Sequence, residues 1–215
     1  MRVAVLSSGR GSNFEAIARA FIGGKIKGEL VALIVNKRNA QAISRAERLG
    51  VNWLFVDPFS FPGREDYDRR LVEILKHLKV DLVCLAGYRL IVSEVFVDAF
   101  PNRILNIHPS LLPSFPGLKP HWQAVTYGVK ISGATVHIVD KGVDTGPIVV
   151  QAAVPVSPDD TPESLSERIL KWEHRIYPQA VKWFADGRVS VEGRKVLVEG
   201  ADYSQLPVVP ALEDF

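Results

Sequence analysis

Short apolar runs rich in β-branched residues alternate with longer segments of helical period along the first two thirds of the chain. The apolar runs are predicted strands, and they cover residues 2–8, 30–36, 52–56, 81–87 and 103–108. Helices are predicted between them, over residues 12–24, about 40–49 and about 65–78. Strands that are apolar throughout and separated by helices are typical of a parallel sheet covered on both faces. We therefore predict a doubly wound α/β unit for this part of the chain.

The pattern changes after residue 130. Two apolar runs, over 132–140 and 147–156, are separated by the turn-rich segment KGVDTG, which predicts antiparallel pairing. A long helix is predicted over about 162–185, and a terminal hairpin over 188–200. No linker rich in Pro, Gly or Ser separates the two parts. The sequence thus predicts one domain over residues 1–215, with a single, mainly parallel sheet and antiparallel C-terminal strands.

Composition, net charge and the lengths of the apolar runs argue against several classes of partner and location for this protein. The 215 residues are 47% hydrophobic and 23% charged, with a formal net charge of +2 and no run of like charges, so a nucleic-acid partner is not expected. The N-terminal apolar stretch is too short for a signal peptide, and no segment has the length of a membrane span. The one cysteine, Cys84, lies in an apolar run and suits a reducing compartment. We expect a cytoplasmic protein with no membrane partner.

The segment SSGRGSN follows the first predicted strand and opens a helix. The backbone N–H groups of Gly11, Ser12 and Asn13 are then placed at the positive end of that helix, where a phosphate group is the usual ligand. The segment lacks the G-x-G-x-x-G spacing of dinucleotide-binding proteins and the lysine of a P-loop. The alternative is a tight turn with Ser12 as a helix N-cap and no ligand.

The segment LNIHPSLLPSFPG places Asn106 and His108 at the end of a predicted buried strand. Residues two apart on a strand share a face, and the carboxyl ends of parallel strands are where α/β sheets bind ligands. Pro109, Pro113 and Pro116 stiffen the connection that follows. The pattern predicts a pair of polar side chains held rigidly at the mouth of a crevice, whereas a lone histidine at a strand end would more simply be part of the packing.

An imidazole that acts as an acid near neutral pH benefits from a neighbouring carboxylate. The segment DKGVDTGP offers Asp140 and Asp144 as partners for His108, although aspartates beside glycines also simply form turns. His137 is interpreted as a core histidine. Glu173, in the middle of the long helix, is explained by a solvated helix face. Histidine and cysteine spacing matches no metal-binding motif.

The chain strongly resembles the phosphoribosylglycinamide formyltransferase family over almost its whole length. The resemblance is carried by SGRGSNFEAI, GREDYD, CLAGY, ILNIHPSLLPSFPGLK, GATVHIVDKGVDTGPIVVQ and KWEHRIYPQAV. It implies formyl transfer from 10-formyltetrahydrofolate, as co-substrate and without a metal, to the amine of 5-phosphoribosylglycinamide in purine synthesis. A homodimer is compatible with it.

The resemblance also implies residue roles. Asn106, His108 and Asp144 would be the catalytic trio. The substrate phosphate would bind to Gly11, Ser12 and Asn13, and Glu173 would bind the ribose hydroxyls. Folate would be bound by Arg64, Arg89, Leu90, Ile91, Val92 and Asn106.

Two segments depart from the family pattern. The family's pocket segment G-[FY]-M-R-[IL]-[LV] is GYRLIV here, with Arg89 at the Met position and Leu90 at the Arg position, and Lys119 stands where His is common. The NIHPSLLP stretch is shared by other enzymes that use 10-formyltetrahydrofolate. The alternatives are therefore a deformylase, another formyltransferase, or a non-catalytic phosphate-binding α/β module.

Overall fold

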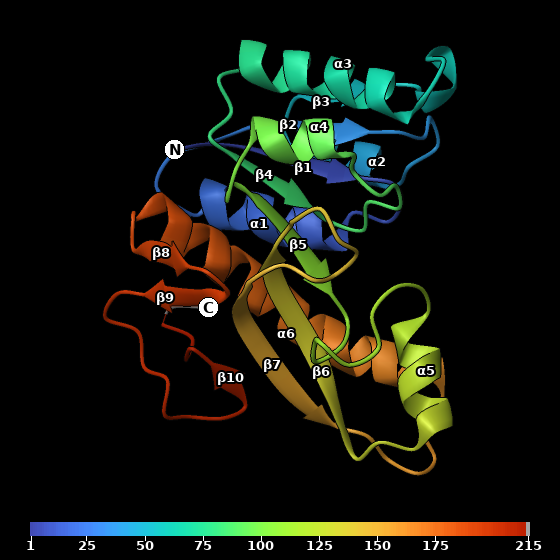
Figure 1. Cartoon of the computed structure of the whole chain (residues 1–215), viewed down its shortest axis with the longest axis vertical. Coiled ribbons are helices and arrows are strands. Elements are labelled where there is room, and N and C mark those ends of the chain that lie inside the picture. Colours follow the sequence, from blue (N-terminus) through green and yellow to red (C-terminus); the bar gives the residue numbers. More distant parts are fainter. Residues whose placement is uncertain (214–215) are drawn as a thin grey trace. The chain divides into compact units, whose positions relative to one another are not determined.

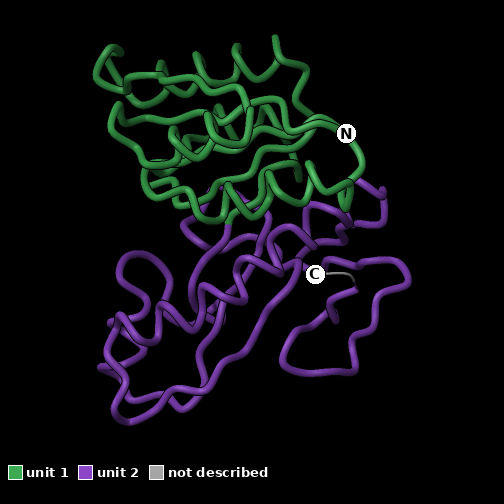
Figure 2. The backbone as a smooth tube through the Cα atoms, turned by 180° about the vertical axis from the view of Figure 1, so that it is seen from behind, with its two compact units in different colours: residues 1–106 green, residues 107–215 purple. Residues whose placement is uncertain are grey.

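The computed structural model describes residues 1–213, which fall into two compact units, residues 1–106 and 107–215 (Figure 2). The boundary lies within a strand rather than in a linker. The single domain that the sequence predicts over residues 1–215 stays a prediction.

The first unit is built on parallel strands (Figure 1). They are β1 (Arg2–Ser7), β2 (Glu29–Val35), β3 (Trp53–Phe55), β4 (Leu82–Leu85) and β5 (Ile104–His108), in the order β3-β2-β1-β4-β5. The residues of β4 and all of β1 after Arg2 are buried, as expected for strands covered on both faces. Because the neighbouring strands run parallel, their carboxyl ends meet at one edge of the sheet.

The helices of the first unit follow the strands. They are α1 (Ser12–Ile22), α2 (Ala42–Leu49), η1 (Pro58–Ser60), α3 (Arg64–His77) and α4 (Glu94–Ala99). Helix α1 packs beside α2, and α3 packs beside α4. Helix α4 and the short η1 were not predicted, because each is too short to show a helical period in the sequence.

The second unit holds α5 (Pro120–Tyr127), β6 (Ile131–Ile138), β7 (Ile148–Pro155), α6 (Pro162–Ala185), β8 (Val189–Glu192), β9 (Lys195–Val198) and β10 (Val208–Val209). Strands β6 and β7 pair antiparallel, as do β8 and β9, which confirms the predicted pairing and the terminal hairpin. Helix α6 has the predicted bounds and packs on β6 and β7. A capping box between Thr161 and Ser164 fixes its start. Helix α5 and strand β10 were not predicted.

The predicted α/β class, with parallel strands first and antiparallel strands after them, is confirmed. One local prediction was wrong. Ser12 is not the N-cap of α1, because Gly11 occupies that position in the left-handed region, with φ of 71°, and no side chain caps the helix. Glycine adopts this conformation without the steric penalty that a Cβ atom brings.

Candidate active site

The carboxyl ends of β1, β4 and β5 bring several predicted site segments together within the first unit. Strand β4 pairs with β1 on one side and with β5 on the other, where Leu85 lies opposite Asn106. The segments that follow β1 and β4 are hydrogen-bonded to each other: Ser8 N donates to Gly87 O (3.2 Å), and Arg89 N donates to Ser8 Oγ (2.9 Å). The predicted phosphate-binding and folate-binding segments therefore start from neighbouring strand ends.

Residues 9–13, the anion loop, lead from β1 into α1. The first N–H groups of any helix lack partners within the helix. The N-cap residue here is Gly11, which has no side chain to cap them. Ser12 is half-buried and Asn13 is buried at the start of α1, and the positive end of a helix is suited to an anion. The simple-turn alternative, which has Ser12 as the N-cap, does not describe this helix start.

Arg64 is the first residue of α3 and is joined to the end of the 89–92 segment through a buried carboxylate. Its Nε lies 3.4 Å from Oδ1 of Asp68, and Oδ2 of Asp68 accepts a hydrogen bond from Ser93 N (2.6 Å). Atoms Nε and Nη2 of Arg64 are buried without a hydrogen bond. The side chain as a whole is 34% exposed and is paired with Asp68. Because buried nitrogens without hydrogen bonds are costly, this guanidinium is suited to bind an anionic or carbonyl-bearing ligand.

The side chains of the 89–92 segment differ in exposure. Arg89 and Ile91 are exposed, whereas Leu90 and Val92 are half-buried. Arg89 donates its backbone N–H to Ser8 Oγ, and the neighbouring Tyr88 hydroxyl donates to the Tyr67 hydroxyl of α3 (3.3 Å). The segment is therefore held to β1 and α3 by contacts that do not depend on the Arg89 side chain.

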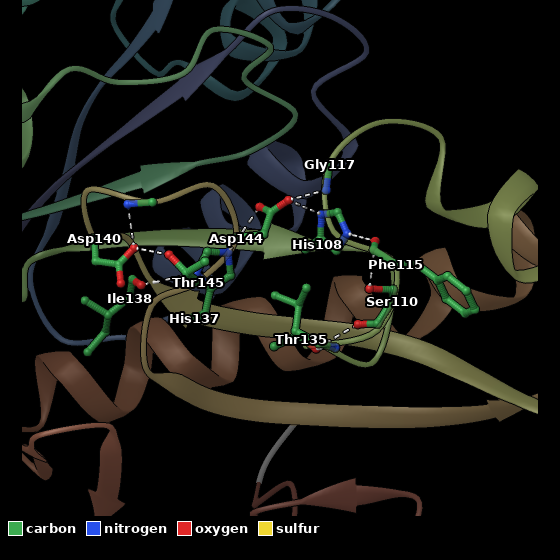
Figure 3. Close-up of polar contacts among 12 residues, drawn as sticks. His108, Ser110, Phe115, Gly117, Thr135, His137, Ile138, Asp140, Asp144 and Thr145 are labelled. Carbon is green, nitrogen blue, oxygen red and sulfur yellow. Dashed lines mark hydrogen bonds and ion pairs between the residues drawn. The ribbon is translucent and has the colours of Figure 1, made fainter.

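In the second unit, His108 lies at the end of β5 with both ring nitrogens facing oxygen atoms (Figure 3). Its Nε2 is 2.8 Å from the backbone oxygen of Phe115, and its Nδ1 is 3.4 Å from Oδ2 of Asp144. A carbonyl oxygen can only accept, so Nε2 carries a proton and donates it to Phe115 O. An imidazolium, with two N–H donors, satisfies both oxygens. His108 is only 5% exposed, so water competes little for these partners.

Asp144 also contacts two other groups. Its Oδ2 accepts a hydrogen bond from Gly117 N (2.8 Å), and its Oδ1 lies 3.7 Å from Nε2 of His137. His137 is buried, as predicted, but its position facing Asp144 was missed. Burial lowers the pKa of His137 more than its hydrogen bond to Ile138 O and the charge of Asp144 raise it. His137 is therefore neutral at pH 7, and Asp144 lies between two imidazoles.

The second candidate carboxylate, Asp140, has a different role. Its Oδ1 accepts hydrogen bonds from Gly142 N (3.0 Å) and Thr145 Oγ1 (2.6 Å). These contacts stabilise the turn between β6 and β7, and in the view of Figure 3 Asp144 lies between Asp140 and His108. The structure thus selects Asp144 from the two aspartates that the sequence left open.

The proline-rich segment after His108 is fixed by hydrogen bonds that the sequence did not reveal. Thr135 on β6 donates to Ser110 O (2.7 Å) and accepts from Leu112 N (3.1 Å). Gln151 on β7 donates to Leu112 O (2.9 Å), and Ser110 Oγ donates to Ser114 O (2.6 Å). The prolines limit the backbone, but these side chains decide where Phe115 O meets His108.

Three further residues of the second unit are Glu173, Lys119 and His121. Glu173 is buried on α6, so its interpretation as part of a solvated face was wrong. Lys119 is exposed, has a φ of 54° and precedes α5. His121, on α5, was not singled out from the sequence. Burial and the charge of nearby His108 both lower its pKa.

Metal binding and membrane insertion are two further properties on which residues 1–213 bear. No set of three or more His, Cys, Asp or Glu side chains in this range is arranged to bind a metal ion. None of the helices there combines the length and the apolar character needed to cross a membrane.

Comparison with known proteins places the chain in a family. Residues 1–181 match the family model described as formyl transferase. Phosphoribosylglycinamide formyltransferase of Escherichia coli (strain K12) is 40% identical over 200 residues, which cover 93% of this chain and 94% of that protein. The chain belongs to the phosphoribosylglycinamide formyltransferase family. The resemblance read from its sequence motifs is confirmed.

Other members show how the family varies in length. The crystal structure of glycinamide ribonucleotide transformylase 1 from Symbiobacterium toebii matches with a TM-score of 0.91 and 51% identity, covering 92% of this chain and 93% of that one. The trifunctional purine biosynthetic protein adenosine-3 of Drosophila melanogaster is 46% identical over 188 residues, but the chain spans only 14% of its length. The family fold therefore occurs both as a separate protein and as part of a much longer one.

Proposed function

We propose that this protein transfers the formyl group of 10-formyltetrahydrofolate to the amine of 5-phosphoribosylglycinamide, a step of purine biosynthesis. The proposal rests on one observation above all. The paired His108 and Asp144 lie in a chain that is 40% identical to the E. coli phosphoribosylglycinamide formyltransferase over nearly its full length. The co-substrate is a folate, and no metal takes part.

In the proposed reaction the amine nitrogen of the substrate attacks the formyl carbon, and the carbonyl oxygen becomes an oxyanion. The bond between that carbon and the folate nitrogen then breaks. The proton lost by the attacking amine is balanced by the proton gained by the leaving folate nitrogen. Donors placed near the oxyanion lower the barrier most, because they act where negative charge develops.

His108 is the proposed acid and oxyanion ligand. Its Nε2–H donates to Phe115 O at 2.8 Å. The formyl oxygen would replace that carbonyl as the acceptor, so the ring needs no reorientation when the substrate binds. Asp144 faces the opposite nitrogen and would stabilise the imidazolium.

Asn106 is the proposed second donor. It lies two residues before His108 on β5, so the two side chains project from the same face of the strand. An amide N–H can donate to an oxyanion without changing its protonation state. The same residue would contact the folate.

The remaining roles concern binding. Gly11, Ser12 and Asn13 would bind the substrate phosphate at the start of α1. Glu173 would accept hydrogen bonds from the ribose hydroxyls. The folate would be bound by Arg64 and by the segment Arg89, Leu90, Ile91 and Val92.

The proposed cellular setting is the cytoplasm. The buried cysteine Cys84, which is in no disulfide, and the bacterial relatives support it. The proposed partners are the two small-molecule substrates alone, with no nucleic acid and no membrane. A homodimer stays a prediction, which sedimentation of the purified protein at several concentrations will test.

A single assay tests the function. Purified protein is mixed with 10-formyltetrahydrofolate, and tetrahydrofolate formation is followed with and without 5-phosphoribosylglycinamide. We expect product only when both are present, with the formyl group on the glycinamide nitrogen. Formate release without the second substrate would instead indicate a deformylase. Binding of phosphate compounds without turnover would indicate a non-catalytic module.

The variant His108→Ala provides the internal test of mechanism. We expect kcat to fall by about 10²- to 10⁴-fold, the range expected for loss of a general acid. Retention of the wild-type circular dichroism spectrum and melting temperature would show that the fold is intact. Near-normal turnover in this variant would contradict the proposed role of His108.

A further inference from the structure

Helix α2 is hydrogen-bonded to the anion loop, although none of its residues is a proposed ligand contact. Ala42 N, at the start of α2, donates a hydrogen bond to Gly9 O (3.0 Å). One turn later, Arg45 Nε donates to Arg10 O (2.8 Å). Two successive carbonyl oxygens of the loop are thus held by one helix.

Steric packing reinforces these hydrogen bonds. A Cβ atom placed on Gly11 would lie 2.5 Å from the Cβ of Ala42, so the loop and the start of α2 are in direct contact. Gly11 O in turn accepts a hydrogen bond from Glu15 N (2.9 Å), which begins α1. The loop backbone is therefore fixed on the side of α2 as well as on the side of α1.

The direction of the carbonyl groups matters for an anion. A loop that binds phosphate must turn its N–H groups to the ligand and its carbonyl oxygens away from it. A single peptide flip at residue 10 would point a carbonyl oxygen at the ligand instead. The hydrogen bond from Arg45 to Arg10 O opposes that flip, because the flip would break a bond to a charged donor.

Arg45 is itself held in place by Glu15 on α1. Its Nη1 forms an ion pair with Glu15, whose side chain is 13% exposed and also pairs with Arg19 at 2.7 Å and with Arg48 at 3.1 Å. Burial raises the pKa of the Glu15 carboxyl, but hydrogen bonds from Arg19 and Arg45 and the charges of Arg45 and Arg48 outweigh it and lower the pKa to about 2. The carboxylate is therefore charged at any pH at which the enzyme works.

We propose that Arg45 is a positioning residue for the phosphate group of the substrate: anchored by Glu15, it holds the Arg10 carbonyl away from the ligand and keeps the N–H groups of the anion loop turned towards it. This role rests on the proposed function, in which that loop binds the phosphate. In this role Arg45, whose Nε is bonded to Arg10 O and whose Nη1 is paired with Glu15, acts through the loop backbone rather than by touching the substrate. It sets the preference for a phosphorylated over a dephosphorylated substrate.

The test compares Arg45→Ala with Arg48→Ala as a matched control. Both variants remove one arginine from the same carboxylate, but only Arg45 reaches the loop. Each enzyme is assayed with 5-phosphoribosylglycinamide and with its dephosphorylated ribosyl analogue, while KM for the folate and the melting temperature are also measured. Arg45→Lys tests whether a conservative donor rescues the effect.

We expect Arg45→Ala to raise KM for the phosphorylated substrate roughly tenfold, the size expected for loss of one charged hydrogen bond, with kcat and the folate KM nearly unchanged. The discrimination against the dephosphorylated analogue should fall by a similar factor, and hydrogen exchange of the loop amides should accelerate. Arg48→Ala should keep the wild-type KM, and Arg45→Lys should recover part of the affinity.

The outcomes distinguish a failure of the proposed phosphate site from a failure of the positioning role of Arg45. If the wild-type enzyme itself shows no preference for the phosphorylated substrate, the proposed phosphate site is wrong. If the wild type shows that preference and Arg45→Ala keeps it, or if Arg48→Ala loses it equally at a similar melting temperature, the positioning role of Arg45 is overturned.

Discussion

Oδ2 of Asp144 lies 3.4 Å from Nδ1 of His108 and accepts a hydrogen bond from Gly117 N at 2.8 Å. One carboxylate oxygen therefore joins the end of β5, the proline-rich segment and the turn after β6. The backbone hydrogen bond orients the carboxylate, and the orientation keeps its charge beside the imidazole. Asp144 has a φ of 54°. Its placement depends on the conformation of the turn after β6 and not on the local sequence alone.

The variant Asp144→Asn should lower kcat by roughly 10²-fold or more, because the amide keeps the shape of the side chain but removes the charge that stabilises the imidazolium. Its amide oxygen can still accept from Gly117 N, so the fold should survive. Steady-state kinetics and a melting curve test this. Asp140→Asn, in the same turn, is the control and should keep near-normal activity. Equal losses in the two variants would argue for a structural role.

Gly11→Ala should weaken binding of 5-phosphoribosylglycinamide and destabilise the protein by about 1–3 kcal/mol. The new Cβ combines a left-handed backbone with a clash against Ala42, so the anion loop must shift. Calorimetric titration with the substrate measures the change. The control Gly50→Ala also has a left-handed φ, of 68°, but opens into free space at the end of α2. It should lose stability while keeping substrate affinity.

Arg64→Ala should raise KM for 10-formyltetrahydrofolate with little change in kcat. Arg64 has buried nitrogens without hydrogen bonds and lies beside the segment expected to bind the folate, but the proposed acid His108 is a separate group. Kinetics at saturating and limiting folate separate the two constants. A large fall in kcat at saturating folate would show that Arg64 serves the chemistry.

Arg89→Met is the companion of that variant and restores the residue common in the family at this position. The Arg89 side chain is exposed, and the residue is bonded to Ser8 through its backbone N–H, so folate affinity should change little. A tenfold loss, worth about 1.4 kcal/mol, would mean that the Arg89 side chain is itself a folate ligand.

Glu15→Gln should lower stability near pH 7 and leave it almost unchanged near pH 2. The pKa of Glu15 falls from 4.5 to about 2 in the folded protein, so its contribution is fully present above about pH 4.5 and is lost as the pH falls towards 2. Melting temperatures of wild type and variant should therefore converge in acid. Glu65→Gln, at a more exposed pair with Arg69, should cost well under 1 kcal/mol at any pH.

Much of the fold follows from local pattern. The buried strands β1, β2, β4 and β5 were predicted because apolar residues continue through them, and the long helix α6 was predicted with its bounds. The short α4 and the two-residue β10 were missed, since segments of that length have no period to detect. Tertiary contacts, rather than propensity, hold them in place.

For the site, the sequence by itself determined which chemistry is available: an amide and an imidazole two residues apart at a strand end, a glycine-rich turn before a helix, and two aspartates in one turn. Only the tertiary structure decided that Asp144 rather than Asp140 meets His108, that His137 faces the same carboxylate, and that Thr135 and Gln151 fix the proline-rich segment. The physical reason is that strand spacing sets the direction of a side chain, whereas its partner comes from a distant segment through packing. The hydrogen bond from Arg45 to the anion loop is also decided by the tertiary structure, because it joins two segments that are distant in the sequence.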